Sequence, residues 1–400
     1  MKNPNRFICL ALALLVLSCN EDDLPNTSAE NLIVMKAFYF RHNGPDKQTI
    51  VVTDPDGKVL SSLKSTYWVD TPIKPTLRGY HGDLVNIYLI DRYDSYYGIS
   101  AFLNLKRGSE FVGPLYEYNY PGVEPSRLKL HNVEPFDHLT FSTDLVGTSI
   151  TQLADTFSLL QNAHIEAGQA YGQLVSNGQG YYGFFDMDKE SGMATLDRAG
   201  MNKPSSKFTI KLAPEVTYSN FSLVGSFDTA SEGWGYQLFS TMGKSQLDIY
   251  YPEEPFAKYF SSLSYYANDR VHTIQREATS LDFNYEDITF NGVITSASPR
   301  NFRMDISGQF DYYVASYTSS SFNTYLTVYS SQRYGNFSIP DFSDIMGNET
   351  FPFTDLSWLH LEMLDYDGVQ ESDEDFKFFT SGKFRWPRDS RTVGMGMPLH

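Results

Sequence analysis

The chain has 400 residues and a net charge of −17, from 31 basic and 48 acidic residues. This balance excludes nucleic acid as a partner, because a nucleic-acid-binding surface is basic. The two cysteines are Cys9 and Cys19, so the chain after residue 19 has no disulfide, cysteine nucleophile, zinc–cysteine site or iron–sulfur cluster.

The first residues have the layout of a secretory signal peptide. Lys2 and Arg6 provide positive charge, and Phe7–Leu17 is an uncharged apolar run of 11 residues. A membrane-spanning helix needs about 20 apolar residues, so this run is too short to remain as a span. We expect cleavage between Ser18 and Cys19, which gives a mature chain of 382 residues. Its 29 basic and 48 acidic residues give a net charge of −19.

The segment Val16–Cys19 (VLSC) resembles the lipobox of bacterial lipoproteins. The resemblance implies that the Cys19 thiol receives a diacylglycerol group and that its new amino group is acylated as well. Two or three acyl chains hold a protein stably on a membrane, whereas one gives only marginal binding. The partner implied at this end of the chain is therefore outer-membrane lipid.

An acidic cluster follows the predicted lipidation site. It resembles the export signal of Bacteroidota surface lipoproteins and consists of Asn20, Glu21, Asp22 and Asp23. The resemblance implies a location on the outer membrane, facing outward. The alternatives are a periplasm-facing position and a polar tether without a signal function. Residues 19–30 are in either case predicted as a lipidated flexible tether.

Residues 31–142 are predicted as one β-sandwich domain. Asn31–Arg41 is almost continuously apolar, and the segment TIVVTDPDGKVLSS (49–62) predicts a hairpin that turns at Asp54–Gly57. Asp83–Arg92 and Tyr97–Lys106 predict two more strands, and a strand at 138–142 closes the domain. The VTDPDGKVL hairpin and YGISAFLNLKRGSEFVG are similar to N-terminal modules of Bacteroidota lipoproteins, which resemble carboxypeptidase regulatory domains. The resemblance implies a non-catalytic module.

Residues 143–400 are predicted to be β-rich and to form one module or two, dividing near residues 280–295. Ser149–Gln161 is predicted as a short helix, and Gln173–Phe185 as a hairpin around Asn177-Gly178. The remaining predicted strands are 207–212, 220–227, 236–241, 246–251, 287–294, 301–317, 322–330, 358–364 and 376–384. The fold class is therefore all-β, with two or three β-sandwich modules in tandem after the signal peptide and tether.

Few residues indicate a ligand site. Trp234 lies between glycines in SEGWGY (231–236), which predicts a loop where Trp234 and Tyr236 could stack on a sugar. The alternative is that this Trp folds back onto the core. Trp68, Trp358 and Trp386 lie in strand-like contexts and are predicted as core or sheet-packing residues.

An acidic cluster near the end of the chain could hold a hard cation such as calcium, because oxygen ligands suit that ion. Its candidate ligands are Asp365, Asp367, Glu371 and Asp373. The alternative is a solvated loop in which like charges repel one another. No cofactor is indicated elsewhere.

The sequence has no zinc-protease, phosphate-loop or nucleophile-elbow motif. We therefore expect a non-catalytic lipoprotein that binds or presents a glycan or another extracellular ligand, in adhesion or beside an uptake protein. The first alternative is a glycan-active hydrolase whose two carboxylates are distant in the sequence. The second is a structural component of a surface assembly.

Overall fold

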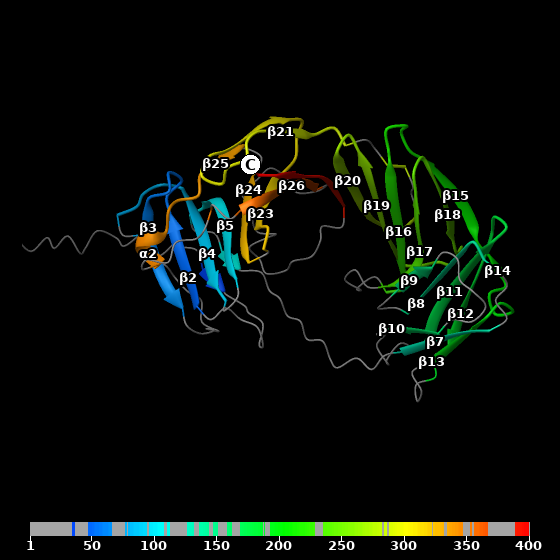
Figure 1. The fold of residues 1–400 in the computed structure, drawn as a ribbon. Coiled ribbons are helices and arrows are strands. Elements are labelled where there is room, and N and C mark those ends of the chain that lie inside the picture. Colours follow the sequence, from blue (N-terminus) through cyan, green and yellow to red (C-terminus); the bar gives the residue numbers. More distant parts are fainter. Residues whose placement is uncertain are drawn as a thin grey trace, which may run out of the picture.

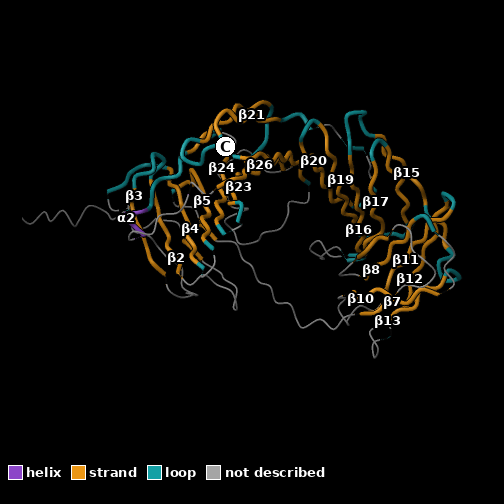
Figure 2. Tube along the Cα trace, in the orientation of Figure 1, coloured by secondary structure: helices purple, strands orange, loops and turns teal. Residues whose placement is uncertain are grey.

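The protein is described here by a computed structural model. The structure describes residues 34–36, 47–65, 77, 79–93, 96–107, 110–112, 126–131, 136–143, 147–150, 158–161, 169–186, 188, 193–228, 235–281, 284–285, 288–321, 323–331, 334–346, 353, 356–366 and 389–399. These residues are almost entirely in strands and connecting turns, which confirms the all-β prediction (Figures 1 and 2). The predicted signal peptide, lipidation site and tether lie outside the described residues.

The elements follow the chain order. The first strands are β1 (Val34–Lys36), β2 (Lys47–Thr53), β3 (Val59–Ser65), β4 (Leu84–Arg92), β5 (Tyr97–Lys106), β6 (Glu110–Val112), β7 (Ser126–His131), β8 (His138–Thr143), β9 (Gly147–Ile150) and β10 (Ser158–Gln161). Next come β11 (Gln169–Ser176), β12 (Gln179–Asp186), β13 (Met193–Asp197), β14 (Lys203–Pro204), β15 (Ser206–Lys211), β16 (Tyr218–Ser226), β17 (Tyr236–Gly243), β18 (Gln246–Tyr251), β19 (Lys258–Ala267) and β20 (Arg270–Ala278). The last are β21 (Asn291–Ser296), β22 (Phe302–Ser307), β23 (Tyr312–Ser319), β24 (Thr324–Ser331), β25 (Asn336–Phe337), α2 (Ser343–Met346), β26 (Leu356–Tyr366) and β27 (Ser390–Pro398).

One sheet of twelve strands runs through the molecule. Its order is β17-β16-β19-β20-β27-β26-β23-β24-β5-β4-β2-β3, and every neighbouring pair is antiparallel except β24 and β5. Strand β27 lies between β20 and β26, so it joins the strands on the two sides of Figure 1 into one hydrogen-bonded sheet. Strands far apart in the sequence therefore become neighbours.

The remaining strands of the described residues form five smaller sheets. They have the orders β14-β12-β11-β8-β9, β10-β7-β13, β21-β22-β25, β15-β18 and β1-β6. The predicted domain boundaries at residue 142 and near residues 280–295 stay predictions.

The two predicted hairpins, β2–β3 and β11–β12, are present. The backbone conformation of each turn explains why the chain reverses there. Strands β2 and β3 are joined by a turn in which Gly57 has φ +88°, and the Lys58 amide donates to Asp54 Oδ1 at 2.8 Å. Asn177 and Gly178 join β11 to β12 with φ values of +52° and +72°. Two positive φ values in a two-residue turn match the right-handed twist of the flanking strands.

Apolar residues alternate with polar ones along the strands, and the inward-facing apolar side chains form two main hydrophobic cores. In β26, Leu359, Leu361 and Met363 point inward and are fully buried, together with side chains of β4, β5, β22, β23 and β24. The second core lies between β15–β18 and the strands β16, β17 and β19, where Phe221 and Ile249 are fully buried. Burying such side chains stabilises the fold by about 1.5–3 kcal/mol each.

Two predicted elements are wrong. The helix at 149–161 is absent in its described part, because residues up to Ile150 form β9 and residues from Ser158 form β10. Strand β9 pairs with β8, and strand β10 pairs with β7. These strand pairings override the weak helical spacing of apolar residues in the segment. The single strand at 301–317 is two strands, β22 and β23, because the chain turns at Gly308, where φ is +77°.

Candidate functional site

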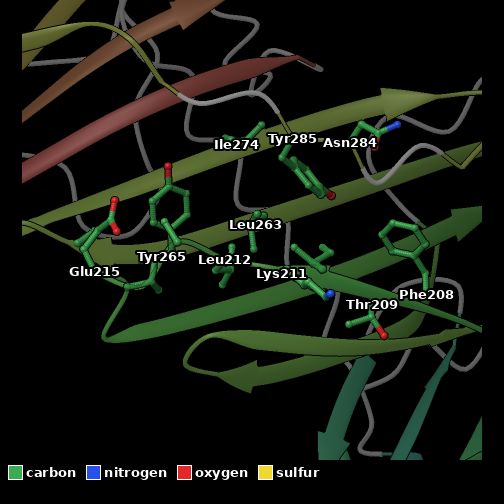
Figure 3. Close-up of a pocket in the computed structure, with 14 residues that line it drawn as sticks. Phe208, Thr209, Lys211, Leu212, Glu215, Leu263, Tyr265, Ile274, Asn284 and Tyr285 are labelled. Carbon is green, nitrogen blue, oxygen red and sulfur yellow. The ribbon is translucent and has the colours of Figure 1, made fainter.

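A groove of about 450 Å³ lies between β15 and the inner face of the β19–β20 hairpin (Figure 3). Its floor is apolar and is formed by side chains that are each less than a tenth exposed. They are Ile210, Val216, Leu263, Ala267 and Ile274. Ile210 and Leu263 belong to the second core, whereas Val216 lies in the connection between β15 and β16.

The rim of the groove is polar and aromatic. Phe208 and Lys211 of β15 lie on one side, with Glu215 after the strand, and Asn284 and Tyr285 lie on another (Figure 3). Phe208 is 36% exposed, and the side chains of Lys211 and Glu215 are also exposed. The rim therefore offers an aromatic ring, a cation, a carboxylate and an amide around an apolar floor.

Strand β15 is itself an edge in the described part of the chain. It pairs with β18 from Ser206 to Lys211, and no described strand pairs with its other edge. An open strand edge carries backbone N–H and C=O groups that can bind a ligand. Residues 208–211 line the groove, so such groups lie close to its rim.

Two tyrosine rings are held in fixed orientations. The ring of Tyr265 stacks on His272, with centroids 4.8 Å apart and planes 5° apart. Burial lowers the pKa of His272, which favours a stack between two neutral rings at neutral pH. The hydroxyl of Tyr285 donates to Ser261 Oγ at 3.0 Å, and the guanidinium of Arg276 lies 5.1 Å from the ring centroid. Held rings of this kind lose little entropy when a ligand packs on them.

This arrangement suits a ligand with one apolar face and several hydrogen-bonding groups, such as a sugar ring. A glycoside hydrolase needs two carboxyl groups about 5–10 Å apart. Glu215 is the one carboxylate in the described lining, while residues 282–283 and 286–287 lie outside the described residues.

Asp248, on the strand next to β15, is committed to other partners. It accepts a hydrogen bond from Thr209 Oγ1 at 2.7 Å and forms an ion pair with Lys207 at 2.9 Å. Lys207, followed by Thr209, lowers the pKa of Asp248, so this carboxyl is poorly suited to be a general acid.

The predicted ligand-binding pair is placed only in part. Trp234 lies outside the described residues. Tyr236 begins β17 and is half-buried, and its ring meets Phe184 edge-on at 5.5 Å and Phe227 at 6.0 Å. Tyr236 is not a lining residue of the groove; it belongs to an aromatic cluster beside the second core.

The predicted cation ligands are likewise placed only in part. Asp365 lies on β26, half-buried, and its Oδ2 is 3.6 Å from Nη1 of Arg391. Asp367, Glu371 and Asp373 lie outside the described residues. Across the part of the chain that the structure describes, no group of three or more His, Cys, Asp or Glu side chains is placed to hold a metal ion.

The segments of the predicted anchor, from Ser18 to Asp23, also lie outside the described residues. Among the residues that are described, no helix is both long enough and apolar enough to cross a membrane.

Trp358 lies on strand β26, against Gly396 of the sheet, as a sheet-packing residue would, but it is 46% exposed and is not a core residue. Trp358, His360 and Glu362 alternate with Leu359, Leu361 and Met363, and only the second set is buried. The alternation WLHLEM was therefore a readable signal that this Trp lies on the polar face. The groove gave no such signal, because its segments meet only in the fold.

No family model matches the chain, and neither does any curated protein. Among 19 solved chains that match, native alpha-2-macroglobulin of E. coli is 12% identical with a TM-score of 0.15, over 89% of this chain and 27% of that one. The elastase-activated form of Escherichia coli alpha-2-macroglobulin is 10% identical with a TM-score of 0.13, over 80% of this chain and 39% of that one. This chain therefore matches well under half of either protein, and the scores carry no argument about function.

Proposed function

We propose that the protein is a lipid-anchored protein of the bacterial outer membrane, facing outward, that binds an extracellular glycan without cleaving it. The anchor is supported by the apolar run that ends at Ser18 and Cys19, and the outward position by the acidic residues that follow. The binding role is supported by the groove, and the net charge of −17 disfavours anionic partners.

The single observation that carries the binding proposal is the chemistry of the groove. Its apolar floor and the rings of Phe208 and Tyr285 can contact the C–H face of a sugar. The side chains of Lys211, Glu215 and Asn284 can hydrogen-bond its hydroxyl groups. Adhesion and capture for a neighbouring uptake protein would both use such a site.

The binding proposal is tested with a glycan array, followed by calorimetric titration of the best ligand against Phe208→Ala. We expect a loss of affinity of roughly fivefold to tenfold, because one aromatic contact is removed. Tyr218→Ala is the matched control, since Tyr218 is 49% exposed on β16 and does not line the groove. An array without any bound glycan would contradict the proposal, and an unchanged affinity in Phe208→Ala would contradict the assignment to the groove.

The two alternatives give other results in the same experiment. A glycan-active hydrolase would shorten the bound glycan over time, which chromatography of the titration mixture detects. A structural component of a surface assembly would bind no glycan, and the Phe208→Ala substitution would have no binding phenotype.

A further inference from the structure

A row of side chains crosses the outer face of the long sheet on β26, β23 and β24. Trp358 is paired with Thr318, and Thr318 with Tyr325, so the three residues lie side by side on neighbouring strands. Trp358 is 46% exposed and Tyr325 is 36% exposed. We call these three residues the aromatic strip. Neighbouring strands are about 4.8 Å apart, so the two aromatic residues have backbones about 10 Å apart.

The fold holds the Trp358 ring against the sheet. Gly396 of β27 is the register partner of His360 and lies diagonally across from Trp358. A Cβ atom placed on Gly396 would lie 2.8 Å from Cζ2 and 3.3 Å from Nε1 of Trp358. The indole ring therefore covers the bare backbone of Gly396, and only a glycine allows this approach. Trp358 is nevertheless 46% exposed.

Tyr325 is supported in a different way. Its ring meets Tyr96 edge-on, with centroids 5.9 Å apart and planes at 89°, and Tyr96 stacks on Tyr93 at 4.0 Å. Beyond Tyr325 the row continues to Gly98 of β5, where a Cβ atom would meet no atom within 4 Å. The sheet surface therefore stays open along the row after the second aromatic residue.

The neighbouring row supplies hydrogen-bonding groups. His360, Ser316 and Thr327 are register partners on the same three strands, all half-buried. His360 Nε2 lies 3.2 Å from Glu362 Oε1, so this carboxylate is paired with an imidazole. None of the residues in these two rows is Lys or Arg. The hydrogen bond with Glu362 raises the pKa of His360, so the imidazolium form is already paired with a carboxylate and offers little to an anionic polymer.

We propose that the aromatic strip binds an extended, neutral polysaccharide, whose sugar rings stack on Trp358 and Tyr325 while hydroxyl groups of the sheet bind its edges. The inference rests on the proposed function, because it assumes that the ligand is a glycan. It adds the ligand class, a polymer and not a single sugar, because a chain is needed to reach from one ring to the other.

A purely structural role must be separated from this one, because an aromatic side chain that covers a glycine on a neighbouring strand also stabilises a sheet. Trp358→Ala would lose both roles, whereas Trp358→Phe keeps a ring over Gly396 with a smaller stacking surface. Tyr325→Ala removes a second contact without touching that glycine.

The test is affinity electrophoresis of the full chain in gels that contain a soluble β-glucan, a xylan, an α-mannan or an α-glucan. We expect the wild type to be retarded by at least one of these, and Trp358→Ala and Tyr325→Ala each to weaken that retardation roughly fivefold to tenfold. Trp358→Phe should lie between them and the wild type. Tyr218→Ala, an equally exposed aromatic residue on the same long sheet, should behave as the wild type.

Three outcomes overturn the inference. Retardation that is unchanged in Trp358→Ala and Tyr325→Ala, but lost in Phe208→Ala, leaves the glycan-binding function intact and removes the strip from it. Equal binding of a monosaccharide and its polymer contradicts the requirement for a chain. Absence of any glycan binding overturns the proposed function as well, and thermal unfolding of each variant shows whether it is folded.

Discussion

At the scale of single residues, buried ionisable groups determine how stability depends on pH. His138 on β8 is 6% exposed, and its ring packs on Phe239 with centroids 4.6 Å apart. Its Nε2 lies 2.9 Å from Thr140 Oγ1. Burial lowers the pKa of His138 to about 4, because the surroundings disfavour the imidazolium form.

The sign of the pH effect follows from this pKa. Between about pH 6.5 and pH 4 the unfolded chain binds a proton at residue 138 and the folded chain does not, so stability falls as the pH falls. We expect the loss to reach up to about 3 kcal/mol at pH 4, and His138→Gln to remove that part of the pH dependence. Urea unfolding at pH values from 4 to 8 measures it.

The control for this experiment is His81→Gln, because His81 is exposed and should leave the pH profile as in the wild type. Asp91 contributes with the opposite sign, since burial raises its pKa to about 6 and charging it as the pH rises is unfavourable. Asp91 is present in both variants, so the difference between their profiles belongs to His138. Parallel profiles for His138→Gln and the wild type would refute the prediction.

At the scale of elements, the β11–β12 hairpin depends on the backbone of its turn. Gly178 has φ +72°, and a Cβ atom there would meet only Tyr250 Oη, at 4.0 Å. Gly178→Ala should therefore cost roughly 1–2 kcal/mol through backbone strain alone. Gly98→Ala is the matched control, since it adds the same methyl group in open space on β5, outside the left-handed region. Equal free energies of unfolding for the two variants would contradict the account.

Strands with clear alternation and glycine-containing turns could be predicted from the sequence, as β2–β3 and β11–β12 were. The β19–β20 hairpin was missed because its turn, Asn268-Asp269, contains no glycine, although both residues have positive φ. Its strands are rich in Ser and Tyr, so their inward residues are not marked by an aliphatic pattern. Since β19 and β20 form one side of the groove, the candidate site was missed with them.

Pairing between distant strands could not be predicted at all. The parallel contact of β5 with β24 joins residues such as Ile99 and Leu326, and local periodicity carries no information about such partners. The aromatic strip depends on the same kind of pairing, because Trp358 and Tyr325 come from different hairpins. The exposure of Trp358 could be predicted from the alternation in its own strand. The identity of the residues beside it on β23 and β24 could not be predicted from the sequence.

At the scale of the whole molecule, the main prediction concerns where the protein is held. Replacing Cys19 with Ala removes the thiol that lipidation requires, so the protein should move from the membrane fraction to the soluble fraction. Fractionation followed by immunoblotting measures this, and Cys9→Ala is the control, because Cys9 lies within the predicted signal peptide. Protease treatment of intact cells should degrade the wild-type protein. A membrane-bound Cys19→Ala protein, or a wild type that the protease spares, would each remove one half of the localisation proposal.

The position of β27 has a consequence for the order in which the protein forms. Residues 390–398 are the link between β20 and β26, and they follow every other strand of the long sheet in the chain. During synthesis these residues emerge after the other strands of the long sheet, so the strands on the two sides of β27 can form separately but cannot be joined before then. Such late, non-local pairing is slow and leaves strand edges open in the meantime. A chain interrupted before residue 390 would therefore carry two unprotected sheet edges, one on β20 and one on β26, without the strand that they share.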